Sequence, residues 1–171
     1  MRKTTIALAF FVAWFFAAPI GWAQNYGDKE HAELAKAMKD AKISLQRGLT
    51  ASTKEGRPIS AKYEMEEGKL QLSVYTMKGD SFSEVIIDHK TGKIAKAEPI
   101  THDDDLKAAQ AQREAMSKAK RSLDAAASDA VKENKGFSAV SVMPAIKDGH
   151  PVADVTLVKG VEWKTFSEKL D

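Results

Sequence analysis

The 171-residue sequence contains no cysteine. The protein therefore has no disulfide framework, no thiol nucleophile and no cysteine that could carry a lipid. An excess of charge of one sign is also lacking, since 26 Lys and Arg residues are balanced by 24 Asp and Glu residues. Proteins that bind nucleic acid usually carry a basic stripe, so we expect no nucleic-acid partner.

Long apolar runs are also scarce. The run over residues 6–18 is shorter than the roughly 20 residues needed to cross a bilayer. It follows Arg2 and Lys3, and the small residue Ala23 stands a few residues after its end. This pattern is typical of a secretory signal peptide. We expect a signal peptide of residues 1–23, cleavage after Ala23, and a periplasmic or secreted protein without a stable membrane anchor.

Two parts of the remaining chain resemble each other. The segment KEGRPISAKYEME from Lys54 is similar to KENKGFSAVSVMP from Lys132, and the pairs Lys78-Gly79 and Lys159-Gly160 correspond further along. The spacing is far longer than the unit of a solenoid repeat. We therefore predict two copies of one small domain, covering residues 24–98 and 99–171.

Each copy is expected to begin with a helix. Apolar residues at Leu34, Met38, Ala41 and Leu45 form one stripe, and Gly48 is the predicted end of the first helix. The second helix is expected over residues 101–136, with an acidic first turn that the helix dipole favours. A pair of shorter helices is the alternative, because a charged arginine interrupts the apolar stripe.

After each helix the apolar period changes to two, which indicates strands. The first copy shows this alternation over residues 59–66, 70–75 and 82–88, and the second copy from Phe137, from Val152 and around Trp163. Short turns containing glycine separate the runs. The predicted fold class is α+β: two copies of a helix followed by an antiparallel three-stranded meander, with the helix packed on one face of the sheet.

In the segment VIIDHKTGKI, residues 85–94, several polar side chains directly follow a predicted strand. Asp88 is placed to accept backbone N–H groups, and Thr91 and Gly92 fit a tight turn with a residue at positive φ. A calcium loop would need further acidic or amide oxygens at alternate positions, where His89 and Lys90 stand instead. We predict a structural turn formed by Asp88, Thr91 and Gly92.

With these elements in place, the chain resembles the PepSY domain family. The resemblance rests on a helix followed by YEMEEGKLQLSVYTMKGDSFSEVIIDHKTGKI, with its hairpin and its closing Asp-x-x-Thr-Gly-Lys. It covers residues 29–97 well and residues 101–171 more weakly, since the second copy has no such closing loop. The resemblance implies a secreted or periplasmic tandem protein related to peptidase propeptides, with no shared catalytic residues. Modulation of a secreted peptidase is the role that it suggests.

The residues do not indicate an enzyme. The histidines outside the predicted signal peptide are isolated, and no Gly-x-Ser-x-Gly elbow is present. His102 precedes three aspartates, but the start of a helix explains those acids without a metal. We therefore expect no catalytic residues, no cofactor and no metal site, and a non-catalytic module that binds a protein or peptide.

A copper carrier is the alternative function, because periplasmic copper proteins gather methionine and histidine. The chain beyond residue 23 contains Met38, Met65, Met77, Met116 and Met143. Several of them fall on predicted apolar faces, where methionine commonly fills a core.

The strand pattern also suggests where a partner binds. Tyr75 and Met77 alternate away from the predicted helix face, and Phe82 and Ile86 share one face of the next strand. Either the second copy packs here and the two copies share a core, or the face stays open and receives a peptide. Tyr75, Met77, Phe82 and Ile86 are therefore the candidate partner-binding surface.

Overall fold

The structure is a computed structural model and describes residues 28–171. The predicted signal peptide and its cleavage site lie outside the described residues. Along the chain the elements are α1 (Asp28–Ala37), the 3-10 helix η1 (Met38–Asp40), α2 (Leu45–Ser52), β1 (Arg57–Glu66), β2 (Lys69–Lys78), β3 (Ser81–Ile87), β4 (Ile94–Pro99), α3 (Asp103–Lys118), α4 (Leu123–Glu133), β5 (Ser138–Lys147), β6 (His150–Lys159) and β7 (Glu162–Lys169).

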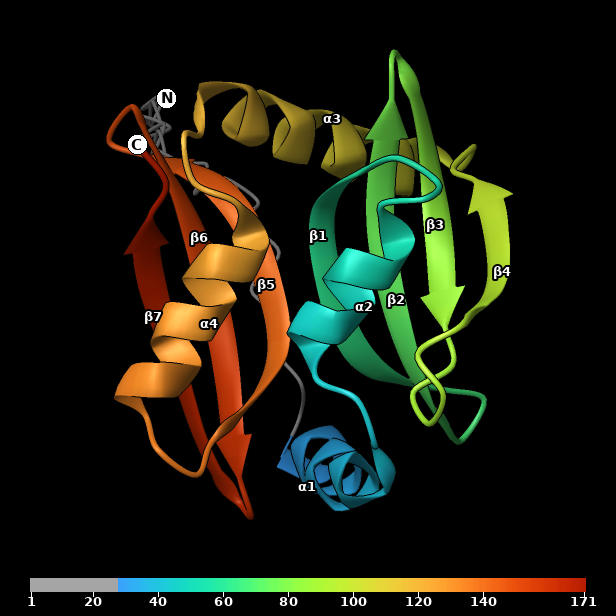
Figure 1. Ribbon diagram of the computed structural model, residues 1–171, viewed down its shortest axis with the longest axis vertical. Helices are drawn as coiled ribbons and strands as arrows, with labels where there is room; N and C mark the ends of the chain where they lie inside the picture. Colours follow the sequence, from blue (N-terminus) through green and yellow to red (C-terminus); the bar gives the residue numbers. More distant parts are fainter. Residues whose placement is uncertain (1–27) are drawn as a thin grey trace, which may run out of the picture.

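The strands form one antiparallel sheet in the order β4-β3-β2-β1-β5-β6-β7 (Figure 1). Two meanders therefore meet at their first strands, where Ala61 is paired with Val142 and Lys62 with Ser141. The predicted α+β class, with two helix-plus-meander units, is confirmed. The first unit adds a fourth strand, β4, and the predicted division after residue 98 falls near its end at Pro99.

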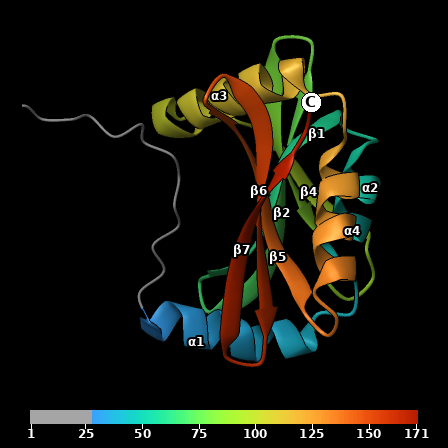
Figure 2. The ribbon, with the colours of Figure 1, turned by 90° about the vertical axis from the view of Figure 1, so that its left-hand side faces the viewer.

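Helices α2 and α4 lie side by side on one face of the sheet (Figures 1 and 2). Between these helices and the sheet, the fully buried side chains include Leu45 of α2, Leu72 of β2, Ala127 of α4 and Leu157 of β6. The buried apolar residues of both units belong to a single cluster. The two copies therefore share one extended core.

The prediction of one continuous first helix over residues 28–48 is wrong. The chain leaves the helical path after the 3-10 turn, and Ser44 caps a new helix by accepting the Arg47 N–H at 3.2 Å. The N–H groups of Lys42 and Ile43 both donate to the His89 carbonyl of the turn after β3, at 2.8 and 3.2 Å. Hydrogen bonds to a carbonyl that is distant in the sequence thus stabilise the interruption between the two helices. Gly48, the predicted end of the first helix, lies inside α2.

The predicted second helix is likewise divided, which agrees with the shorter-helix alternative. Ser122 caps α4 by accepting the Ala125 N–H at 3.1 Å. The N–H groups of Lys120 and Arg121 donate to the Leu170 carbonyl at 2.6 and 3.0 Å. In both units, therefore, the helical segment is interrupted where two backbone N–H groups donate to a carbonyl that is distant in the sequence.

Helix α3 lies on the opposite side of the sheet from α2 and α4, and α1 crosses the other end of the molecule (Figure 2). α3 belongs to the second unit but is bonded to strands of the first. The Ser60 hydroxyl donates to Gln112 Oε1 at 2.8 Å, and Arg57 Nη2 donates to the Met116 carbonyl at 3.0 Å. Because α3 covers only one end of this face, the strands of the first unit remain partly uncovered.

Candidate functional site

A groove lies on the uncovered face of β1–β4. Its volume is about 290 Å³, and every strand of the first unit contributes to it. The registers place Glu64 opposite Gln71 and Glu84 opposite Glu98, so side chains of neighbouring strands meet on one face. The groove is lined by Lys62, Glu64, Glu66, Gln71, Glu84, Ile86, Lys96 and Glu98.

The charges in the groove are partly matched. Lys62 Nζ lies 2.5 Å from Glu64 Oε2, and both side chains are largely buried. Lys96 Nζ lies 2.7 Å from Glu98 Oε2 near the sheet edge, where both side chains are exposed. The second pair contributes little to stability, because solvent screens it.

Acidic groups outnumber lysines in the groove, and this shapes its electrostatics. Burial raises the pKa of Glu64 above its ordinary value, and the charges of Glu84 and Glu66 raise this pKa further, while Lys62 opposes the shift. The Ser73 hydroxyl donates a hydrogen bond to Glu84. The groove is therefore electronegative, and a cationic group placed there would relieve the repulsion among its carboxylates.

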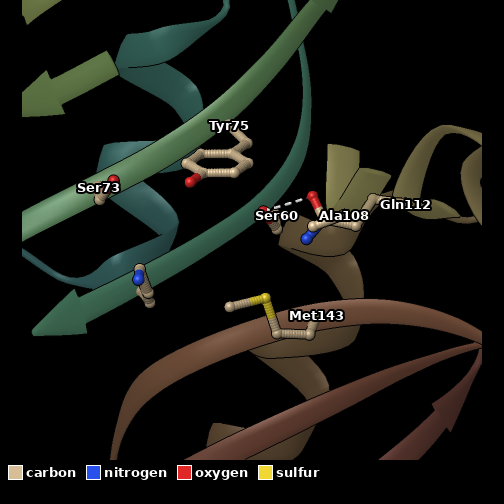
Figure 3. Close-up of a pocket in the computed structure, with 7 residues that line it drawn as sticks. Ser60, Ser73, Tyr75, Ala108, Gln112 and Met143 are labelled. Atoms are coloured by element: carbon tan, nitrogen blue, oxygen red, sulfur yellow. Dashed lines mark hydrogen bonds between the residues drawn. The ribbon is translucent and has the colours of Figure 1, made fainter. Parts of the chain in front are cut away.

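A small cavity adjoins the groove beneath α3 (Figure 3). Its volume is about 20 Å³, which is room for about one water molecule. It shares Lys62 with the groove, and its lining combines hydroxyl, amide and thioether groups: Ser60, Lys62, Ser73, Tyr75, Ala108, Gln112 and Met143. The cavity can hold a solvent molecule or the tip of a small side chain, but not a cofactor.

The four candidate surface residues lie on the groove side of the sheet, at different depths. The Tyr75 hydroxyl donates to Asp105 Oδ1 of α3 at 3.1 Å, and burial, followed by the Asp105 charge, raises the pKa of Tyr75. Phe82 is only 5% exposed, and Met77 is partly buried against the core. Ile86 lines the open groove. Of the four candidate residues, Ile86 is therefore the one that contributes to the lining of the groove.

Helix α3 holds its position over Phe82 through Arg113. The guanidinium carbon lies 5.6 Å from the centroid of the Phe82 ring, and Nη1 donates to Asp80 Oδ1 at 2.8 Å. A helix of the second unit thus covers a strand of the first. Sequence patterns gave no indication of this contact, since it depends on where the two units meet.

The turn after β3 is built around Asp88. Its Oδ1 accepts the N–H groups of Lys90 and Thr91 at 2.9 and 2.8 Å, and these bonds lower the pKa of the Asp88 carboxyl. Gly92 has a φ of 74° and donates to the Asp88 carbonyl at 2.8 Å. His89 adds a structural contact, because its carbonyl accepts the two N–H groups that precede α2.

The other histidines lie apart from the groove. His31 stacks on Trp163 with ring centroids 4.5 Å apart, and His150 Nδ1 lies 2.7 Å from Asp171 Oδ2. His102 occupies the N-cap position of α3 without a side-chain cap bond. Over residues 28–171, no group of three or more His, Asp or Glu side chains is arranged to hold a metal ion.

The five methionines of the copper hypothesis stand on five different elements: η1, β1, β2, α3 and β5. Met116 is buried, whereas Met143 lines the small cavity. The hypothesis that they bind copper stays a prediction from the sequence.

No helix between residues 28 and 171 combines the length and the apolar character needed to cross a membrane. No protein-family model and no curated protein sequence matches the chain. Among solved structures, the chain is similar to the crystal structure of a "putative lipoprotein" from Clostridium difficile 630, at 14% identity and a TM-score of 0.40. The match covers 70% of this chain and 79% of that one.

Proposed function

We propose that the protein is a non-catalytic binding module that takes an extended, cationic segment of a peptide or protein in the groove of the first unit. The observation that carries this proposal is the uncovered groove itself, with four glutamates against two lysines and one apolar side chain, Ile86. Complementary charge gives a binding surface specificity and speeds association.

The groove lies beside β4, which is an edge strand in the described sheet. A segment that lies along such an edge gains main-chain hydrogen bonds, and its alternate side chains point to one face of the sheet. Those side chains would enter the groove near Glu98 and Glu84. Lysine or arginine at alternate positions is therefore the sequence that we expect the groove to prefer.

The finer proposal concerns location and role. The signal-peptide pattern before Gln24 supports export to the periplasm or beyond, and intact-mass analysis of the exported protein is expected to show an N-terminus at Gln24. The tandem helix-plus-meander units and the turn at Asp88 support a PepSY-like protein that restrains or guides a secreted peptidase. A segment of such a peptidase would then be the natural occupant of the groove.

Fluorescence polarisation with labelled peptides tests the proposal. The probes are extended peptides with lysine or arginine at alternate positions, and matched peptides with glutamate at the same positions. We expect binding of the cationic probes only, weakened by salt because the attraction is electrostatic. Failure of the cationic probes to bind, or equal binding of the acidic ones, would refute the proposal.

A pair of charge reversals then locates the site. Glu84→Lys, in the groove, is expected to weaken binding at least about tenfold, since it replaces an attraction with a repulsion inside the site. Glu133→Lys makes the same charge change at the exposed end of α4, on the other face, and is expected to leave binding unchanged. Equal loss in both variants would mean that only overall charge matters, which contradicts a site in the groove.

A further inference from the structure

The outer edge of β7 is the part of the second unit that the binding proposal leaves without a role. β7 is the last strand of the sheet, and within residues 28–171 no strand pairs with its outer side (Figure 1). An edge strand with unpaired backbone groups is a template for pairing with another chain. The side chains of β7 determine which kind of strand could pair with this edge.

The hydrogen bonds at the end of β7 show which backbone groups are available. The Leu170 N–H donates to the Pro151 carbonyl on β6 at 3.0 Å. The N–H and C=O groups of successive residues in a strand point to alternate sides. The backbone groups of Phe166 therefore point toward β6, as the N–H of Leu170 does, whereas those of Thr165 and Ser167 point away from β6. The contact of Arg121 Nη1 with the Lys169 carbonyl, at 2.7 Å, agrees with this alternation. The middle of β7 therefore presents outward N–H and C=O groups.

The side chains of β7 are complementary to a second copy of the same strand. A two-fold axis perpendicular to the sheet keeps the same face of both copies on the same side. With that axis at Phe166, antiparallel pairing sets Lys164 of each copy opposite Glu168 of the other. The two Phe166 rings face each other at the closely spaced central position, and Thr165 and Ser167 exchange backbone hydrogen bonds.

Neighbouring registers lack this complementarity. Moving the axis to Thr165 sets Glu162 opposite Glu168, and like charges directly opposite are destabilising. Moving it to Ser167 sets Phe166 opposite Glu168. Over the described residues Glu168 makes no ion pair, whereas Lys164 Nζ lies 3.4 Å from Glu162 Oε1 and 4.5 Å from the centroid of the Phe137 ring. Of the three registers, the one centred on Phe166 thus sets opposite charges opposite each other and also brings the two aromatic rings together.

The other edge of the sheet, formed by β4, is less suited than β7 to pairing with a second copy of itself. β4 is shorter than β7 and ends in Pro99, which has no N–H to donate. Its Lys96 and Glu98 already pair within the strand. We propose that two copies of the protein associate through β7, antiparallel and centred on Phe166, so that their sheets become continuous. The proposal is independent of the groove, which lies in the other unit.

Sedimentation velocity on the chain from Gln24 to Asp171, over a wide range of concentration, tests the association. Thr165→Pro removes an outward N–H without removing a bond to β6, and it is expected to give a monomer with nearly unchanged melting. Ala97→Pro is the matched control on β4, where the bond from the Ile100 N–H to the Phe82 carbonyl places Ala97 outward by the same alternation. The control is expected to remain a dimer.

A charge exchange tests the register. Lys164→Glu and Glu168→Lys are each expected to raise the dimer dissociation constant at least about tenfold, because the dimer contains the pair twice. The double variant restores opposite charges and is expected to recover the dimer. A wild-type protein that is monomeric throughout, a dimer that survives Thr165→Pro, or a double variant that fails to recover would each overturn the proposal.

Discussion

Gly48 allows α2 to lie close to the sheet, and replacing it with alanine tests that approach. A Cβ at position 48 would lie 2.4 Å from Leu72 Cδ2 and 3.2 Å from Leu72 Cγ. Carbon atoms in contact normally lie about 3.5–4.0 Å apart, so the helix or Leu72 must move by about 1 Å. Leu72 is fully buried, which leaves its side chain no solvent-facing space to enter.

Two opposing effects set the size of the change. Overpacking a well-filled core costs about 1–3 kcal/mol, whereas alanine favours the helix over glycine by about 1 kcal/mol. We expect Gly48→Ala to lower the free energy of unfolding by about 1 kcal/mol, which corresponds to a fall of about 2–4 °C in Tm. Chemical denaturation with linear extrapolation gives the value directly.

Two controls separate the effects. Thr50 is exposed on the same helix, so comparing glycine with alanine there measures helix propensity without the contact. In a Leu72→Ala background the contact is absent, and Gly48→Ala is expected to become neutral or stabilising. If Gly48→Ala alone is as stable as the wild type, α2 does not approach β2 as closely as the structure shows.

Three further predictions concern single groups. Tyr63→Phe removes the hydroxyl that donates to the Ile43 carbonyl at 2.8 Å and is expected to cost about 1 kcal/mol in urea denaturation; no change would mean that the bond is replaced by solvent. Gly92→Val places a β-branched residue at a φ of 74° and is expected to cost about 1 kcal/mol or more by strain, seen as a lower Tm. For Glu64, a raised pKa means that the folded protein binds the proton more tightly than the unfolded chain, so this group's contribution to stability falls as pH rises through the folded pKa. Glu64→Gln is therefore expected to remove part of the stability that the wild type gains on mild acidification, and identical pH profiles of Tm would contradict this.

The hairpins could be predicted from the sequence because their causes are local. Glu67-Gly68 and Asp148-Gly149 each stand between two alternating runs, and all four residues have positive φ in the structure. Such two-residue turns favour Asp or Asn followed by Gly, and their twist matches that of the flanking strands. The strand assignments follow from the same local pattern.

The helix breaks were harder to predict, although the sequence contained an indication. Ser44-Leu45 and Ser122-Leu123 occur at equivalent places in the two copies, and each serine caps a helix. A stripe of apolar residues continued across Ser44 and suggested one helix. The break occurs because the preceding N–H groups find a carbonyl far along the chain, which no local pattern indicates.

The sequence by itself determined the two repeated units, their strands and their turns, since the period of two and the glycine-containing turns act over a few residues. Only the tertiary structure decided that β1 pairs with β5, that α3 covers Phe82 of the other unit, and that a groove remains over Glu64 and Glu84. The physical reason is that the alternation of apolar and polar residues along a strand indicates which side chains share a face of the sheet, but not which element covers that face. Packing between distant segments of similar apolar character makes that choice.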